Sequence, residues 1–162
     1  MGIRLLKIAM AKIVAGLALF YALQNMMNLD AAYGAFTYVM SMTDVSVYGN
    51  SFGPAITSPT LVWLAVILIV GAEFLAGILA AHGAWDMWKA RKGSDAEFAA
   101  SKTRAILGAG VGVVVWFGFF GVVGGAYFQM WQTELGSSSL SGAFQYAVTC
   151  AVALIYLSMK DE

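Results

Sequence analysis

The chain has 162 residues, of which 60% are hydrophobic and only 11% are charged, and its nine basic side chains are balanced by nine acidic ones. Its mean hydropathy is +0.77, and a water-soluble domain of this size cannot bury so much apolar surface. Disordered, collagen-like, coiled-coil and disulfide-rich chains are excluded as well, because there are two prolines, one cysteine and no heptad pattern of charges. We therefore predict an integral membrane protein that has the lipid bilayer as its main partner and binds no nucleic acid.

Four segments are long and apolar enough to cross a bilayer, which takes roughly 20 residues of helix. These predicted spans cover residues 5–24, 60–88, 105–128 and 142–158. The segments are continuously apolar and do not alternate, which favours helices over a β-barrel. The predicted fold is an all-α membrane protein, a four-helix transmembrane bundle that forms a single domain over residues 1–162.

The first span follows Arg4 and resembles the opening of a signal peptide. Its apolar run is longer than a typical signal core, and no small-residue cleavage site precedes a soluble domain. We therefore predict a signal anchor that is retained in the protein.

Residues 25–59 form the longest segment between predicted spans. Asn28 is a suitable N-cap, Asp30 suits the first turn of a helix, and apolar residues follow at spacings of three and four. We expect a short helix that lies flat on the outer membrane face. It either caps the bundle, which the aromatic residues of this segment favour, or presents a docking surface to a partner.

The second span begins at Ser58 and Pro59, which suit an N-cap and a first helical position. Small residues recur along the second and third spans: Ala72, Ala76, Ala80 and Ala84, then Gly108, Gly112, Gly118, Gly121 and Gly125. Because no hydrophobic effect draws helices together in lipid, small residues promote association by allowing close backbone approach. We predict a tight hairpin of these two spans, and surplus glycines could face another subunit.

The connectors between the spans differ in charge. Residues 89–101 form a charged connector, and residues 136–142 are predicted to be a flexible turn. All nine lysines and arginines lie near the chain ends or this connector, whereas the loops 25–59 and 129–141 contain none. By the positive-inside rule, both ends of the chain are predicted to be cytoplasmic.

Glu73 lies near the middle of the second span, where a carboxylate must pair, become protonated or line a cavity. Lys12 of the first span is the natural partner, so a buried Lys12–Glu73 contact is one hypothesis. The alternatives are that Lys12 extends to the cytoplasmic headgroups, and that Glu73 is a protonated acid hydrogen-bonded to a neighbouring helix, for example near Trp116.

His82 is the only histidine and lies nine residues from Glu73, on the opposite face of the helix. One histidine cannot supply a bis-histidine haem, so a shared haem or a quinone contact is less favoured than a histidine at the membrane interface. Three tryptophans are predicted interface anchors: Trp85, Trp88 and Trp131. Cys150 lies inside the fourth span, which excludes an intramolecular disulfide, and we expect no metal, no cofactor and no catalytic residue.

Several segments resemble one known family. They are NLDAAYGAFTYVMSM (28–42), AITSP (55–59), AEFLAGILAAHGAWDMWKAR (72–91) and WFGFFGVVGGAYFQMWQ (116–132). Together they are similar to the bacterial small integral membrane proteins of unknown function, which have four spans and about this length. The resemblance implies a multi-pass protein of the bacterial inner membrane, with Glu73 and the Trp131 region as signature positions, and it transfers no catalytic residue.

Three functions are compatible with this sequence. The favoured one is a non-catalytic accessory or scaffold subunit of a larger inner-membrane assembly, such as a respiratory or other energy-converting complex, with other membrane subunits as partners. The second is a small transporter or channel that uses Glu73 as a proton- or cation-sensitive site. The third, with the least support, is an enzyme component that interacts with a quinone or a lipid.

Overall fold

The computed structural model describes residues 2–48 and 50–161. Within these residues every regular element is a helix: α1 (Gly2–Met27), α2 (Leu29–Ser41), α3 (Pro59–Ala90), α4 (Asp95–Ser101), α5 (Thr103–Val113), the π-helix η1 (Val114–Tyr127), the 3-10 helix η2 (Met130–Gln132) and α6 (Glu134–Ser158). Four helical stretches are long and apolar enough to cross a membrane, namely α1, α3, α4 to η1, and α6. The predicted all-α, four-span fold is therefore confirmed.

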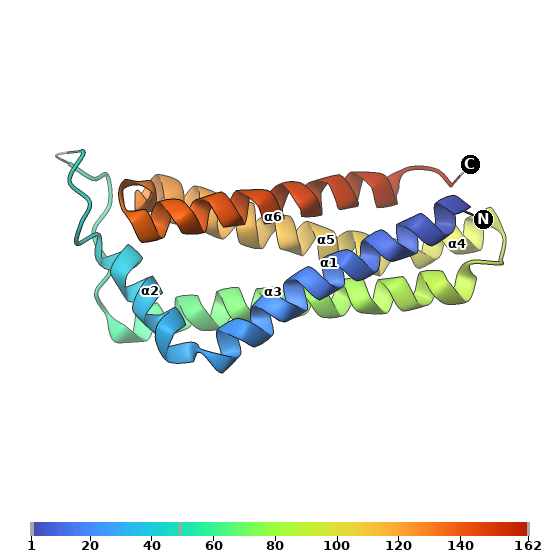
Figure 1. The fold of residues 1–162 in the computed structure, drawn as a ribbon, viewed down its shortest axis with the longest axis horizontal. Helices are drawn as coiled ribbons and strands as arrows, with labels where there is room; N and C mark the ends of the chain where they lie inside the picture. The colour runs from blue at the N-terminus through green and yellow to red at the C-terminus, as the bar shows by residue number, and fades with distance from the viewer. Residues whose placement is uncertain (1, 49, 162) are drawn as a thin grey trace.

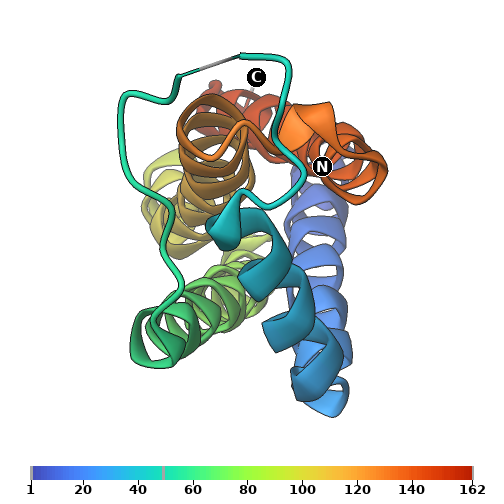
Figure 2. The same cartoon turned by 90° about the vertical axis from the view of Figure 1, so that its left-hand side faces the viewer.

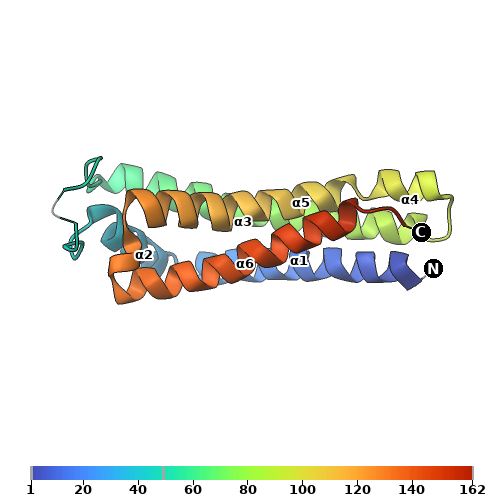
Figure 3. The ribbon, with the colours of Figure 1, turned by 90° about the horizontal axis from the view of Figure 1, so that it is seen from above.

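The four long stretches lie side by side along one axis (Figures 1 and 3). The start of α1, the short helix α4 and the segment after α6 lie at one end, where Lys7 Nζ is 2.7 Å from Asp161 Oδ1. Because the lysines and arginines gather there, we call it the basic end. Helix α2 and the long loop that follows it lie at the opposite end, which we call the α2 end.

Ion pairs close the basic end. The carboxylate of Asp161 forms ion pairs with Lys7 Nζ at 2.7 Å and with Lys102 Nζ at 2.8 Å. All three side chains are almost completely buried. Burial alone would raise the pKa of Asp161, but the hydrogen bonds and charges of the two lysines outweigh it and leave this pKa below its ordinary value. These contacts tie the start of α1, the start of α5 and the segment after α6 together.

Small residues bring α3 into close contact with α1 and α5. A Cβ atom at Gly108 would lie 2.6 Å from Ala80 N, and a Cβ atom at Gly77 would lie 2.5 Å from Leu19 Cγ. Gly83 meets the backbone of Ala105 even more closely. Only glycine permits such backbone contact, which is why this region of the bundle is so narrow.

Helix α1 ends beside the middle of α3. The contact of Asn25, in the last turns of α1, with Glu73 of α3 shows this position. Helix α2 begins two residues after the end of α1 and runs obliquely toward the α2 end of the bundle (Figures 1 and 2). Tyr33 stacks on Trp63 with 4.7 Å between the ring centroids, and Met40 packs in a cluster with Val62. The predicted helix over this segment is present, and it packs against the first turns of α3.

The third span changes its helix type part-way. From Val114 to Tyr127 the backbone follows the wider π-helix, and Phe128 N still donates to Val123 O, five residues earlier, at 3.0 Å. The π form is rare and is frequent at functional sites when it occurs. The predicted span 105–128 therefore corresponds to α5 followed by η1, and hydropathy predicts that the segment spans a membrane without predicting the change of helix type.

The predicted flexible turn at residues 136–142 is wrong, because these residues belong to α6. Thr133 caps this helix by accepting a hydrogen bond from Gly136 N at 3.1 Å, and Ser139 donates to Leu135 O at 2.8 Å. The cap and the Ser139 bond stabilise the first turns of this helix, and the other serines of the stretch are exposed. The chain turns instead just before η2, where Gln129 adopts a left-handed conformation with φ of 54°.

Candidate functional site: an apolar cavity beside a buried carboxylate

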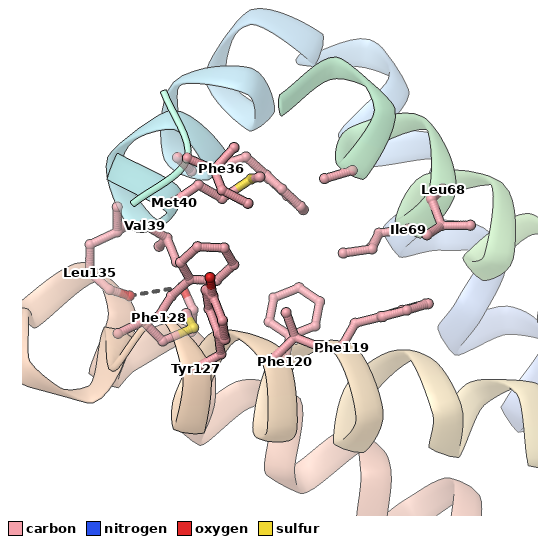
Figure 4. Close-up of a pocket in the computed structure, with 17 residues that line it drawn as sticks. Phe36, Val39, Met40, Leu68, Ile69, Phe119, Phe120, Tyr127, Phe128 and Leu135 are labelled. Atoms are coloured by element: carbon pink, nitrogen blue, oxygen red, sulfur yellow. Dashed lines mark hydrogen bonds between the residues drawn. The ribbon is translucent and has the colours of Figure 1, made fainter. Parts of the chain in front are cut away.

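A cavity of about 390 Å³ lies between α2, α3, η1 and α6, toward the α2 end of the bundle. Figure 4 shows Phe36 and Met40 of α2 on one side, Leu68 and Ile69 of α3 on another, and Phe119 and Phe120 of η1 opposite them. Its volume falls within the range of ordinary small-molecule sites. The site is therefore large enough for a ligand of this size class.

The lining of the cavity is almost entirely apolar. The hydroxyl of Ser139 donates to Leu135 O at 2.8 Å, and the hydroxyl of Tyr127 donates to Pro54 O at 3.1 Å. Both polar groups are thus occupied by the protein itself. The cavity offers dispersion contacts to an apolar molecule and little to orient a polar one.

The cavity opens on the side of the bundle. Leu68 and Val123, which line it, are 55% and 42% exposed, whereas Ile69 and Met40 lie deeper and are less than 10% exposed. In a bilayer this side of a spanning helix faces lipid tails. An apolar chain can therefore enter laterally from the membrane.

Glu73 lies one helical turn beyond Ile69 on the same face of α3, and it does not itself line the cavity. Its side chain is buried, and Asn25 Nδ2 of α1 donates to Glu73 Oε2 at 3.0 Å. The bond lies just before the break between α1 and α2. A buried polar bond at this level fixes the register of α1 against α3.

The predicted Lys12–Glu73 contact is wrong. Lys12 lies opposite the last turns of α3, where its ammonium is 5.5 Å from the ring centroid of Trp88. Because α1 and α3 run antiparallel and Asn25 is already level with Glu73, Lys12 is about 20 Å further toward the basic end. Counting residues from the start of each span could not reveal this offset between the two helices.

One family matches nearly the whole chain. Residues 3–160 match the family described as "Predicted small integral membrane protein (DUF2165)". The chain belongs to this family. The resemblance seen in the sequence is thereby confirmed. No curated protein and no solved structure gives a significant match.

In this member of the family, the other polar and aromatic residues that the sequence predicted as site residues or interface anchors lie apart from the cavity. His82 is exposed on the face of α3 away from Glu73, and Trp85 is exposed beside it. Trp131 packs edge-on against Tyr48, with 5.5 Å between the ring centroids. Cys150 is buried in α6. Within residues 2–48 and 50–161, no three histidine, cysteine or acidic side chains are grouped to hold a metal ion.

The small residues have different surroundings. Ala76 and Ala80 are fully buried against Gly108, while Ala72 is only partly buried. A Cβ atom at Gly112 would meet Cys150 Sγ at 2.8 Å, and one at Gly125 would meet Leu140 Cδ2 at 3.3 Å. Gly121 differs from these, because a Cβ atom there would contact only Phe117 of its own helix. The predicted hairpin thus closes at Gly108, whereas Gly112 and Gly125 pack against α6 and Gly121 contacts neither helix.

Sequence reasoning missed the cavity and the partner of Glu73. The signal that could have found the cavity is the aromatic density of the WFGFFG stretch at residues 116–121, which places large side chains where a tight helix pair needs small ones. Asn25 could have been found as the nearest polar side chain at the far end of the first span. From the sequence, residues 116–121 are predicted to lie in the third span and Asn25 in the loop 25–59.

Proposed function

We propose that this protein binds a single apolar chain, of a lipid or an isoprenoid, in the cavity between α2, α3, η1 and α6. The observation that supports this function is the cavity itself, which is about 390 Å³ in volume, apolar, and open toward the side of the bundle. An empty apolar space of this size forfeits the contacts of its lining. A chain from the bilayer restores them without breaking any hydrogen bond.

The aromatic side chains give the proposed site its shape. Phe119 and Phe120 of the wide π-helix line the cavity on the side opposite α2, as Figure 4 shows. Rings of this kind supply large and rigid contact surfaces. The site is suited to a flexible hydrocarbon, which can adapt to a cavity with these walls, more than to a polar substrate that needs directional bonds.

We propose as well that the protein works as an accessory subunit in a bacterial inner membrane, with the basic end in the cytoplasm. The orientation is supported by the lysines and arginines collected at that end. The subunit role is supported by Gly118 and Gly121. A Cβ atom added at either glycine would meet only side chains of its own helix, so both positions leave space for a partner helix. Purification in mild detergent followed by mass spectrometry tests this role, and a protein that always runs alone contradicts it.

Photo-crosslinking tests the cavity. The probe is a phosphatidylcholine with a diazirine in one acyl chain, and crosslinks are mapped by mass spectrometry. We expect crosslinks at Met40 and Ile69, which are buried and which only a chain inside the cavity can reach. The variant Ala35→Phe, whose new ring extends into the cavity, should reduce these crosslinks about tenfold, since a filled cavity excludes the chain.

The matched control is Ala31→Phe, one turn earlier on α2, exposed and outside the lining of the cavity. It should leave the crosslinks at Met40 and Ile69 unchanged. Crosslinks confined to exposed residues, or an equal loss in both variants, would contradict the proposal. Competition with a polyisoprenoid alcohol then distinguishes a preference for branched chains from a preference for straight ones.

The transporter alternative has a separate test. Glu73 is held by Asn25 and lies beyond the lining of the cavity, so chain binding does not require it to change its charge. Proton or cation flux is measured in proteoliposomes that contain the native protein or the Glu73→Gln variant. A flux that the substitution abolishes would favour the transporter over a binding subunit.

A further inference from the structure

A second concave site lies between α1 and α3 at the basic end. It has a volume of about 250 Å³ and is lined by Lys12, Ala15, Ala81, Ala84, Trp85 and Trp88. We call it the Trp88 groove. Trp88 is about 22 Å along α3 from Glu73, so this groove is separate from the apolar cavity and independent of the function proposed for it.

Two cations lie against the indole ring of Trp88. The Lys12 ammonium is 5.5 Å from the ring centroid, and the Arg91 guanidinium is 3.9 Å from it. Arg91 is held in place because its Nη1 donates to Trp88 O at 2.6 Å and its own carbonyl accepts from Arg4 at 3.2 Å. The ring of Trp88, which lines the groove, is thus in contact with one positive charge from α1 and with a second from the residue that follows α3.

Neighbouring carboxylates are already used by other cations. Asp86 forms ion pairs with Arg104 at 2.7 Å and with Lys89 at 3.1 Å, and Asp95 forms one with Arg4. Among residues 2–48 and 50–161, no acidic side chain forms an ion pair with Lys12 or Arg91. The rim of the groove therefore carries uncompensated positive charge.

The floor of the groove has the opposite character. Ala15 and Ala84 are buried, and together with Ala81 they leave a shallow apolar trough between the two helices. Trp85, whose side chain is 61% exposed, lies at its edge. Both helices are apolar enough to span a membrane, so the trough faces lipid while its charged rim lies at the bilayer surface.

We propose that the Trp88 groove binds one anionic phospholipid of the leaflet at the basic end. Its phosphate accepts hydrogen bonds from Lys12 and Arg91, and one acyl chain lies in the alanine trough beside Trp85. A groove with a cationic rim and an apolar floor complements an amphiphile that carries an anionic headgroup. Basic pockets between transmembrane helices recognise lipids in this way.

Native mass spectrometry of the purified protein tests this site. The protein is titrated with phosphatidylglycerol or with phosphatidylcholine in the same detergent, and retained lipid is counted. We expect one phosphatidylglycerol to be retained in preference to phosphatidylcholine. The double variant Lys12→Gln, Arg91→Gln should weaken binding of that first phosphatidylglycerol about thirtyfold, since two basic contacts are lost, and leave phosphatidylcholine unaffected.

Two further variants keep the test decisive. Lys92→Gln removes an exposed cation outside the groove and should change binding less than about twofold. Ala81→Leu fills the trough without altering any charge, and should also reduce phosphatidylglycerol retention if an acyl chain lies there. Equal retention of the two lipids, unchanged binding in the double variant, or displacement of the lipid by inorganic phosphate alone would overturn the proposal. Thermal unfolding of each variant confirms that the bundle is intact.

Discussion

The third span packs against α3 in two different ways along its length. Toward the basic end, α5 and α3 are in backbone contact, with Gly108 against Ala80 and Gly83 against Ala105. Toward the α2 end, η1 and α3 diverge, and Phe119, Phe120 and the side chains of α2 surround a cavity between them. One pair of helices thus forms both the narrowest contact and the most open part of the bundle.

This difference follows from side-chain size and helix type. In lipid the helices gain no hydrophobic energy from meeting, so their separation is decided by how closely their surfaces fit. Glycine and alanine allow contact of the two backbones along α5. Phenylalanine on a wider π-helix prevents it along η1, and the early end of α1 leaves room for α2 to cover the open side. The bundle therefore combines a rigid half with a half that can accept a ligand.

The largest expected effect comes from breaking the narrow half. A valine at Gly83 would overlap the backbone of Ala105, which cannot move without separating α3 from α5. We expect Gly83→Val to lower the free energy of unfolding by about 3 kcal/mol. The measurement is thermal unfolding in detergent. Gly71→Val, on the same helix with nothing within 4 Å of the added Cβ atom, is the control and should cost less than about 1 kcal/mol.

A smaller effect is expected at the ion pairs that close the basic end. Asp161→Asn leaves the buried ammonium groups of Lys7 and Lys102 without their carboxylate. We expect a loss of about 2 kcal/mol, because an unpaired buried charge is costly even near the aqueous phase. Asp95→Asn, which removes an exposed partner of Arg4, is the control and should have almost no effect.

The same carboxylate predicts a pH dependence. The pKa of Asp161 is lower in the folded protein than its ordinary value near 4, so its contribution to stability is complete above that value. It is lost as the pH falls through the lowered pKa. Unfolding curves measured from pH 6 to pH 3 should therefore show a decline in the native protein that is weaker in Asp161→Asn. Equal declines in the two proteins would contradict this role.

The smallest effect is expected at the boundary between the two halves, where Asn25 donates to Glu73. Asn25→Ala and Glu73→Ala, each of which removes one partner of the bond, are compared singly and together by thermal unfolding. We expect a coupling energy of about 1 kcal/mol, the usual net value of one buried hydrogen bond. Strict additivity of the two substitutions would mean that this bond does not stabilise the register of α1. Lys12→Met removes the side chain that the sequence suggested as the partner of Glu73, and it should show no coupling to Glu73 because Lys12 lies beside Trp88.

The outcome for the short helix after α1 shows the limit of local patterns. The apolar spacing after Asn28 correctly predicted a helix, which the structure places at Leu29–Ser41, but the Asn28 side chain does not cap it and donates to Gln24 O at 2.8 Å. Its position depended on where α1 stops relative to α3, which the Asn25–Glu73 bond reveals. Likewise, the serines of residues 136–142 are typical of a loop in the sequence. In the structure Thr133 caps the N-terminus of α6, and these residues form its first turns.

The number of spans and the separation of charge along them follow from the amino-acid sequence without any knowledge of the fold. Both properties depend on how each segment interacts with the bilayer and the surrounding water. They can therefore be predicted for one segment without knowing where the other segments lie. The tertiary structure alone decided that Glu73 meets Asn25, that Lys12 meets Trp88, and that a cavity separates η1 from α3. These depend on the axial offset and spacing of helices, which are set by the fit of side chains from distant parts of the chain.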